Sequence, residues 1–307
     1  MKDGIFKGIG IMIIVRIREG LGNQMFQYAT AYALARRLNQ PLLLFHDEVY
    51  ENRPFRLNLF NINETTIESN ELPLNIKLIR NKYMNCVLRK LHIIKESRQD
   101  QYVQFQLGRW LYFSELQNGF QKPLLALNSG NIFLNGFFLS HSLFEKCRKD
   151  LLSSFIPSYP GETDFINTLN QIKGCNSVAV HVRRGDYRFS NHPYHYLLGE
   201  DYYRRAISYI RKKVETPVFF WFSEDFEWVH EHFRSEKDFR FIKLQTMHRD
   251  IDEMMLMKNC NHIITANSTF SWWAAWLNEH ENPIRIIPEK RFGNEMVPDS
   301  WILLPIF

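Results

Sequence analysis

The chain lacks a long apolar run and has few cysteines. The N-terminal run from Gly8 to Val15 is far shorter than the ~20 residues that span a bilayer. It passes straight into a charged segment, without the small-residue cleavage pattern of a signal peptide. The four cysteines lie far apart and show no metal-ligand spacing. We therefore expect reduced thiols in a cytoplasmic protein. The cysteines are Cys86, Cys147, Cys175 and Cys260.

The chain also lacks a strong charge imbalance. Its net charge is +5 and its pI about 8.9, and we interpret its Lys and Arg residues as scattered along the chain. A nucleic-acid binder would concentrate them in a stripe, so no nucleic-acid partner is expected. An acidic small substrate or a weak attraction to a membrane surface is compatible with this charge. The hydrophobic content of 45% and aromatic content of 15% indicate a globular protein with sizeable cores.

A length of 307 residues fits two domains. The apolar patterns predict a strand at residues 12–17, a helix at 24–38 and a second strand at 41–45. Residues 1–11 form a candidate leader before Met12. Residues 49–127 give no clear assignment. Two prolines and a glycine in residues 155–161 predict a boundary, so we expect domains at 1–157 and 158–307.

The second domain alternates between strand-like and helix-like segments. This alternation predicts an α/β fold whose parallel sheet carries helices on both faces. The expected strands cover 178–182, 217–222, 239–244, 261–266 and 283–287, and the expected helices cover 201–213, 226–233, 250–258 and 269–280.

The most informative segment is Val178 to Tyr187, where an apolar strand ends in concentrated charge. His181, Arg183, Arg184 and Asp186 follow one another in a single turn. Ligands of open α/β sheets bind beyond the carboxyl ends of the strands. Arginine presents a planar fork of donors to phosphate oxygens, which suits a departing diphosphate. The alternative is a surface turn with solvated arginines.

A second candidate segment begins Gly-Leu-Gly-Asn-Gln at position 20. It resembles a dinucleotide fingerprint, but Met25 replaces the third glycine, so NAD is disfavoured. We expect a tight turn in which Gly22 lets the backbone approach a ligand while Asn23 and Gln24 offer amide groups at a helix N-terminus. The alternative is that Asn23 only caps the helix.

A third segment, Thr265 to Trp276, predicts a strand end followed by a helix that starts near Ser268. Its hydroxyls and backbone N–H groups would lie at the positive end of a helix dipole, as an anion site requires. Alternatively, Ser268 or Thr269 only caps the helix. The spacing of Trp272, Trp273 and Trp276 predicts the helix's core face.

Two acidic segments leave their roles open. Asp250 and Asp252 form an Asp-x-Asp motif, which can hold a divalent cation, start a helix or recognise a nucleoside. Because residues two apart on a helix point to different faces, the metal reading is disfavoured. The segment Phe222-Ser-Glu-Asp either brings polar groups to the ligand-binding crevice beyond the strand ends or forms a turn that binds no ligand.

Together these segments resemble the α-1,2-fucosyltransferases of glycosyltransferase family 11, of the bacterial type. The similar motifs are Gly20-Leu-Gly-Asn-Gln-Met-Phe-Gln-Tyr-Ala, His181-Val-Arg-Arg-Gly-Asp-Tyr and Asn267-Ser-Thr-Phe-Ser-Trp-Trp-Ala-Ala-Trp-Leu. Phe222-Ser-Glu-Asp and Asp250-Ile-Asp-Glu-Met occur between them in the family's order. The resemblance runs from Met12 to the C-terminus and is loose between about 51 and 131.

The resemblance implies two facing Rossmann-like lobes of the GT-B type. The N-terminal lobe would bind the acceptor and the C-terminal lobe GDP-fucose. Arg183 would contact the donor diphosphate as the catalytic residue, helped by Arg184. Asn23 would lie near fucose or the β-phosphate, and Asp252 near guanine or ribose. The donor-binding set is Gly22, Asn23, Gln24, His181, Arg184, Asp186, Asp252, Asn267, Ser268, Thr269 and Phe270.

The implied reaction moves L-fucose from GDP-β-L-fucose to the 2-hydroxyl of a β-galactoside glycan. An α-1,2 product from a β-linked donor requires inversion. We expect no metal cofactor, and weak association with the inner face of a bacterial membrane. No general base can be chosen among His46, Asp47, Glu48 and Asp186. The alternatives are another GDP-sugar or linkage, and a non-catalytic glycan-binding protein.

Overall fold

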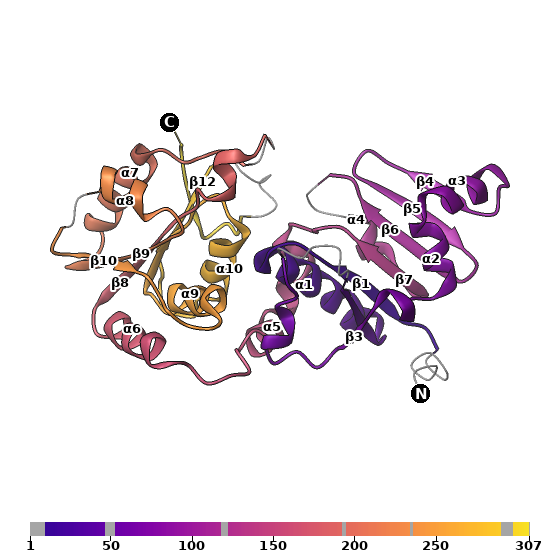
Figure 1. Cartoon of the computed structure of the whole chain (residues 1–307), viewed down its shortest axis with the longest axis horizontal. Helices are drawn as coiled ribbons and strands as arrows, with labels where there is room; N and C mark the ends of the chain where they lie inside the picture. The colour runs from indigo at the N-terminus through magenta and orange to yellow at the C-terminus, as the bar shows by residue number, and fades with distance from the viewer. Residues whose placement is uncertain are drawn as a thin grey trace. The chain divides into compact units, whose positions relative to one another are not determined.

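The computed structural model describes residues 10–46, 53–117, 122–191, 195–233, 236–289 and 297–306. The chain divides after Ser158 into two compact units, and the C-terminal residues 297–306 belong to the second. Each unit is built around its own sheet with helices packed against it (Figure 1).

The first unit contains a seven-stranded mixed sheet in the order β3-β2-β1-β7-β6-β5-β4. Its opening β-α-β unit is the predicted one. The strands β4 and β5 add an antiparallel edge within the region that the sequence left unassigned. Gly108, at φ +57°, makes the tight β5–β6 turn that an L side chain would strain. The strands are β1 (Ile13–Ile17), β2 (Leu42–His46), β3 (Thr65–Ile67), β4 (Lys95–Arg98), β5 (Tyr102–Leu107), β6 (Trp110–Glu115) and β7 (Asn131–Asn135).

The first helix starts earlier than expected. Its N-cap is Gly20, so Gly22 and Asn23 lie in the first helical turn and the reading of Asn23 as the cap is wrong. Asn39, in the left-handed conformation, ends the helix. The helices are α1 (Leu21–Leu38), α2 (Leu74–Arg80), α3 (Lys82–Lys90), α4 (Lys122–Ala126) and α5 (Arg148–Ser154).

The second unit has a six-stranded sheet in the order β10-β9-β8-β11-β12-β13, and every pairing is parallel. This confirms the predicted parallel sheet, while α6 and β13 were not predicted. The strands are β8 (Asn176–Val182), β9 (Pro217–Ser223), β10 (Phe239–Ile242), β11 (His262–Ile264), β12 (Arg285–Pro288) and β13 (Ile302–Leu304). The helices are α6 (Thr163–Lys173), α7 (Glu200–Arg211), α8 (Phe226–His232), α9 (Arg249–Lys258) and α10 (Thr269–Leu277).

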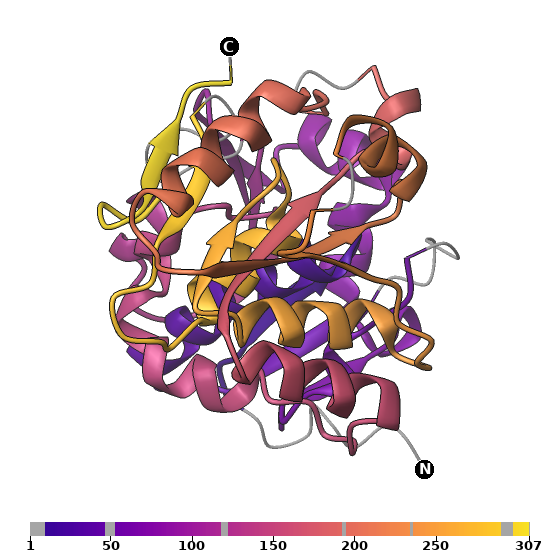
Figure 2. The same cartoon turned by 90° about the vertical axis from the view of Figure 1, so that its left-hand side faces the viewer.

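Helices cover both faces of this parallel sheet (Figure 2). Because side chains alternate along a strand, Val178, Val180 and Val182 of β8 point to one face, where they pack with buried residues of α7 and α8. The helices α6, α9 and α10 pack together on the other side. Trp272, Trp273 and Trp276 are buried there, which confirms the predicted core face of α10.

Within the described ranges, no helix is both long and apolar enough to cross a membrane.

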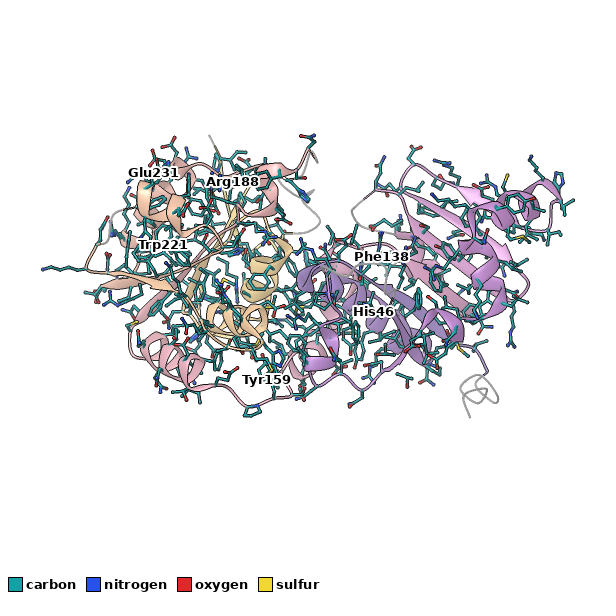
Figure 3. The ribbon with its side chains drawn as sticks, in the orientation of Figure 1. His46, Phe138, Tyr159, Arg188, Trp221 and Glu231 are labelled. Atoms are coloured by element: carbon teal, nitrogen blue, oxygen red, sulfur yellow. The ribbon has the colours of Figure 1, made fainter. Side chains whose placement is uncertain are left out.

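The core of the second unit gives a stability prediction. Trp221 on β9 is fully buried, with its ring centroid 4.7 Å from that of Phe233 and 5.2 Å from that of Phe239 (Figure 3). We expect Trp221→Ala to lower the free energy of unfolding by about 3–5 kcal/mol, because the cavity cannot collapse completely. Urea unfolding measures this. Met247→Ala, at a side chain that is 81% exposed, is the control and should change stability by less than ~0.5 kcal/mol.

Candidate active site

The turn that follows β8 holds Arg183 between two carboxylates. Its Nη2 lies 2.7 Å from Oδ1 of Asp186, and its Nη1 lies 3.6 Å from Oε1 of Glu224. The guanidinium also lies 5.4 Å from the ring centroid of Tyr187. About a quarter of the Arg183 side chain stays exposed (26%). The planar donor group is therefore held in place at the strand end and still open to a ligand.

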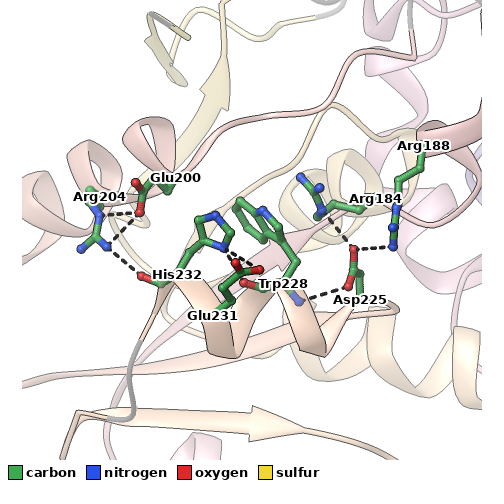
Figure 4. Close-up of polar contacts among 8 residues, drawn as sticks. All are labelled: Arg184, Arg188, Glu200, Arg204, Asp225, Trp228, Glu231 and His232. Carbon is green, nitrogen blue, oxygen red and sulfur yellow. Dashed lines mark hydrogen bonds and ion pairs between the residues drawn. The ribbon is translucent and has the colours of Figure 1, made fainter.

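Arg184 is held more tightly than Arg183. Its Nε donates to Oδ2 of Asp225 at 3.1 Å, its guanidinium stacks 4.3 Å from the Trp228 ring, and its backbone N–H donates to Glu224. Arg188 reaches the same oxygen of Asp225 at 3.4 Å, while the other oxygen accepts from the N–H of Trp228 and caps α8 (Figure 4). The ion pair between Arg184 and Asp225 thus holds the turn against the start of α8.

Gly185 is required by the close approach of Glu224 across the turn. A Cβ at this position would lie 2.8 Å from Cγ and 2.9 Å from Oε1 of Glu224. Any larger residue would therefore push Glu224 away from both arginines. The glycine of the Arg-Arg-Gly-Asp sequence lets the two strand ends pack together.

The start of α10 lies next to this turn. The hydroxyl of Tyr187 donates to the carbonyl of Asn267 at 3.2 Å, so one side chain contacts both Arg183 and the strand end before α10. The ring of His181, on β8, lies 5.6 Å from that of Phe270. The structure therefore brings together the predicted residues that follow β8 and β11.

Ser268 is the N-cap of α10, as one of the two readings expected. Its hydroxyl accepts from the N–H of Phe270 at 3.3 Å, and Thr269 is the first helical residue. The amide of the buried Asn267 donates to the carbonyl of Tyr196 at 2.7 Å. Asn267 thus fixes the 195–198 segment beside the helix start.

A cavity of about 670 Å³ opens at the carboxyl ends of β8, β9 and β10. Its size matches the pockets that hold nucleotide-sized ligands. Three cations and three carboxylates line it, so it favours a ligand with both phosphate groups and hydrogen-bond donors. These charged residues are Arg188, Lys243, Arg249, Glu224, Asp225 and Glu227.

Asp252 is 2% exposed, in the first turn of α9. The hydroxyl of Tyr159 donates to its Oδ1 at 2.8 Å, and the Tyr159 ring packs against His248. Its Oδ2 is buried and accepts no hydrogen bond from a described residue. In the part of the chain that the structure describes, no three His, Cys, Asp or Glu side chains are grouped to hold a metal.

Three predicted residues belong to the first unit. Gln24 is buried, and its amide nitrogen donates to the carbonyls of Glu19 and Pro54 while its oxygen accepts from the N–H of Arg56. Gln24 therefore holds the segment around Pro54 onto the start of α1. Gly22 and Asn23 lie in the same helical turn. Among the candidate bases, His46 ends β2, whereas residues 47 and 48 lie outside the described ranges.

Sequence reasoning missed a perturbed acid on α9. Glu253 is largely buried, which raises its pKa to about 7, although the neighbouring Arg249 lowers it through a 2.7 Å contact. An i,i+4 Arg–Glu pair was visible in the sequence, but only the tertiary structure buries the acid beside the cavity. The role of Tyr187 was also missed, although it ends the quoted motif, and so was that of Arg188, which follows the motif.

The chain is similar to known glycosyltransferases. The family model of glycosyl transferase family 11 matches residues 12–298. The O-antigen biosynthesis glycosyltransferase WbnK of Escherichia coli is 31% identical over 93% of this chain and 98% of its own length. An α-1,2-colitosyltransferase of E. coli is 32% identical over 95% and 98%. The galactoside α-(1,2)-fucosyltransferase 1 of Leontopithecus chrysomelas is 30% identical over 47% and 42%.

Among solved structures, the fucosyltransferase NodZ from Bradyrhizobium matches with a TM-score of 0.53 over 87% of this chain and 93% of its own, at 14% identity. That likeness concerns the fold. The two α/β units, one of them with an all-parallel sheet, have the GT-B fold. The chain belongs to glycosyl transferase family 11.

Glu253 makes stability depend on pH. Its folded pKa of about 7 lies above the ordinary value of 4.5, so the folded state binds the proton more tightly than the unfolded chain. The free energy of unfolding should therefore fall as pH rises from about 4.5 to about 7, by roughly 3 kcal/mol for this group. Urea unfolding across this range should show a flatter profile for Glu253→Gln. An unchanged profile would contradict the assignment.

Proposed function

We propose that this enzyme transfers L-fucose from GDP-β-L-fucose to the 2-hydroxyl of a β-galactoside glycan, with inversion to an α-1,2 linkage. The family membership supports the proposal. So do the names of two relatives, both of which give an α-1,2 linkage and one of which gives a galactoside acceptor. The structural observation that carries it is the position of Arg183, partly exposed at the carboxyl end of β8.

Arg183 supplies the charge that the reaction needs. When the C1–O bond to the donor breaks, the bonding electrons leave with the β-phosphate of GDP, and negative charge grows there. A guanidinium already oriented by Asp186 and Glu224 needs no reorganisation to receive that charge. Its two parallel N–H donors match the oxygens of a diphosphate. The acceptor hydroxyl attacks from the opposite side of the anomeric carbon, forms the new C1–O bond and releases its proton to solvent.

The start of α10 provides the second group of donors. The backbone N–H groups of the first helical turn and the helix dipole favour an anion there. Tyr187 joins this helix start to the Arg183 turn through its contact with Asn267. We propose that Ser268, Thr269 and Phe270 contact the phosphate and the fucose. The His181 ring packs near that of Phe270.

The nucleoside would occupy the cavity beside this turn. Asp252 does not line this cavity, and its buried Oδ2 would accept from guanine or ribose only after the Tyr159 side chain moves aside. In the first unit, Gln24 already uses its amide group in holding the segment around Pro54. Asn23, one residue earlier in α1, is the side chain that we propose for the fucose or the β-phosphate, on the basis of the family motif that contains it.

A second candidate donor follows from one relative. The α-1,2-colitosyltransferase of E. coli aligns over nearly the whole chain, so a colitosyl donor is the alternative to GDP-fucose. The described contacts at Arg183 and α10 would serve any nucleoside diphosphate sugar, because they address the phosphates. Competition between the two donors in one reaction decides between them.

Replacing Arg183 tests the catalytic assignment. We expect Arg183→Ala to lower kcat at least 100-fold, since a lost contact to the charge of the transition state costs a few kcal/mol of barrier. Arg183→Lys should recover only part of the rate, because an ammonium group cannot form the two parallel hydrogen bonds. Initial rates of GDP release measure both variants.

The matched control for this experiment is Arg204→Ala. Arg204 lies on α7, pairs with Glu200 and is half exposed (Figure 4). Its loss removes one positive charge from the same unit and should leave the rate within about twofold of the parent, because surface ion pairs contribute little. If Arg183→Ala retains more than about a tenth of the parent rate, Arg183 has no part in the mechanism.

Metal independence is a separate prediction. Since Arg183 and the helix start supply the positive charge, we expect the same turnover in EDTA as in buffer. The comparison uses initial rates with and without chelator, followed by additions of Mg²⁺ or Mn²⁺. Rate loss in EDTA with recovery in either cation would instead support a metal role for Asp250 and Asp252.

A further inference from the structure

The positive charge of the chain is concentrated in one segment. Residues 74–98 contain seven Lys or Arg residues and one acid, Glu96, and so carry a formal charge of +6. The whole chain carries +5, so the other 282 residues together carry −1. Although 31 of the 38 basic residues lie elsewhere along the chain, the net positive charge is therefore not evenly spread as expected. The segment forms α2, α3 and β4, beside β5 in the first unit (Figure 1).

On α3 the basic residues lie on one exposed side. At 3.6 residues per turn, the exposed residues of this helix fall within an arc of about 120°. Leu88, outside this arc, is buried against the core of the first unit, which fixes the direction in which the arc faces. The exposed residues are Lys82, Tyr83, Cys86, Arg89 and Lys90.

Large apolar side chains are exposed among these cations. Leu74, Tyr83, Leu91 and Ile93 are 51 to 75% exposed, and they are four of the thirteen large hydrophobic side chains that are exposed within the described residues. The 25-residue segment therefore carries about a third of them. Scattered exposed leucines are ordinary, but a cluster interleaved with basic residues is typical of an interaction site.

Two lysines of α3 are available for an outside partner. Arg89 pairs with Glu96, yet Lys82 and Lys90 form no ion pair with any described residue. Both lysines line a groove of about 440 Å³ together with Arg80 and Arg89. Four positive side chains around one groove suit a phosphate group.

We propose that this basic and apolar surface, formed by Lys82, Tyr83, Arg89, Lys90, Leu91 and Ile93, docks the enzyme on an anionic lipid bilayer. The charges complement lipid phosphates, and the tyrosine and aliphatic side chains would enter the interfacial region. A nucleic-acid backbone would satisfy the charges and leave the exposed leucine and isoleucine in water. The proposal does not rest on the donor or the acceptor, because docking needs no turnover.

Vesicle sedimentation tests the proposal directly. The full chain is mixed with vesicles of phosphatidylglycerol and phosphatidylcholine in equal parts, or of phosphatidylcholine alone, and the bound fraction is measured. We expect binding to the anionic vesicles, weakened by added salt, and little binding to the neutral ones. Equal binding to both vesicles, or to neither, overturns the proposal.

Charge variants locate the surface. Each basic residue near an anionic membrane strengthens binding about fivefold, so Lys82→Gln with Lys90→Gln should weaken it roughly 25-fold. The control is Lys212→Gln with Lys213→Gln, which removes the same charge from exposed positions at the end of α7. If the two double variants bind alike, the basic residues of α3 are not the docking site.

Apolar variants separate a membrane from other polyanions. Tyr83→Ser should weaken vesicle binding, whereas Met247→Ser, at an equally exposed side chain in the second unit, should not. A fluorescent duplex DNA is added as competitor. Displacement of the protein from vesicles by DNA at matched phosphate concentration, together with no effect of Tyr83→Ser, would assign the surface to nucleic acid and overturn the proposal. Circular dichroism confirms that each variant is folded.

Discussion

The candidate site depends on one carboxylate packed across one glycine. Glu224 lies against Gly185 so closely that a Cβ there would be 2.8 Å from Cγ of Glu224. From that position it contacts the side chain of Arg183 and the backbone of Arg184. Two strand ends of a parallel sheet are thereby joined, and the Arg183 guanidinium is held between Asp186 and Glu224. A diphosphate would therefore meet a guanidinium that these carboxylates have already oriented.

Positive charge has two separate uses in this chain. In the second unit, Arg183 and Arg184 are each matched by acids, so the site has directed donors without a large net charge. In the first unit, residues 74–98 carry an unbalanced +6 beside exposed apolar side chains. The first arrangement favours precise recognition of one diphosphate, while the second favours a broad anionic surface. Overall net charge conceals this division because the remaining residues are nearly neutral.

Much of the second unit could be predicted from the sequence, because its signals are local. Apolar strands followed by polar residues predicted β8 and β9, and the tryptophan spacing predicted the buried face of α10. The middle of the first unit could not be predicted, since β4 and β5 are partly exposed and pair antiparallel at a sheet edge. The burial of Glu253 was equally invisible, because elements distant in sequence enclose it. The N-cap of α1 was misplaced because glycine and asparagine are both favoured caps.

The central claim concerns the product, and its linkage is the most direct measurement. The purified enzyme is incubated with GDP-fucose and lactose or N-acetyllactosamine in EDTA, and the product is analysed by mass spectrometry and NMR. The account predicts a galactose with α-linked fucose on O2. A product with fucose at another position or with β configuration would contradict the proposed reaction, as would a complete absence of donor binding and turnover.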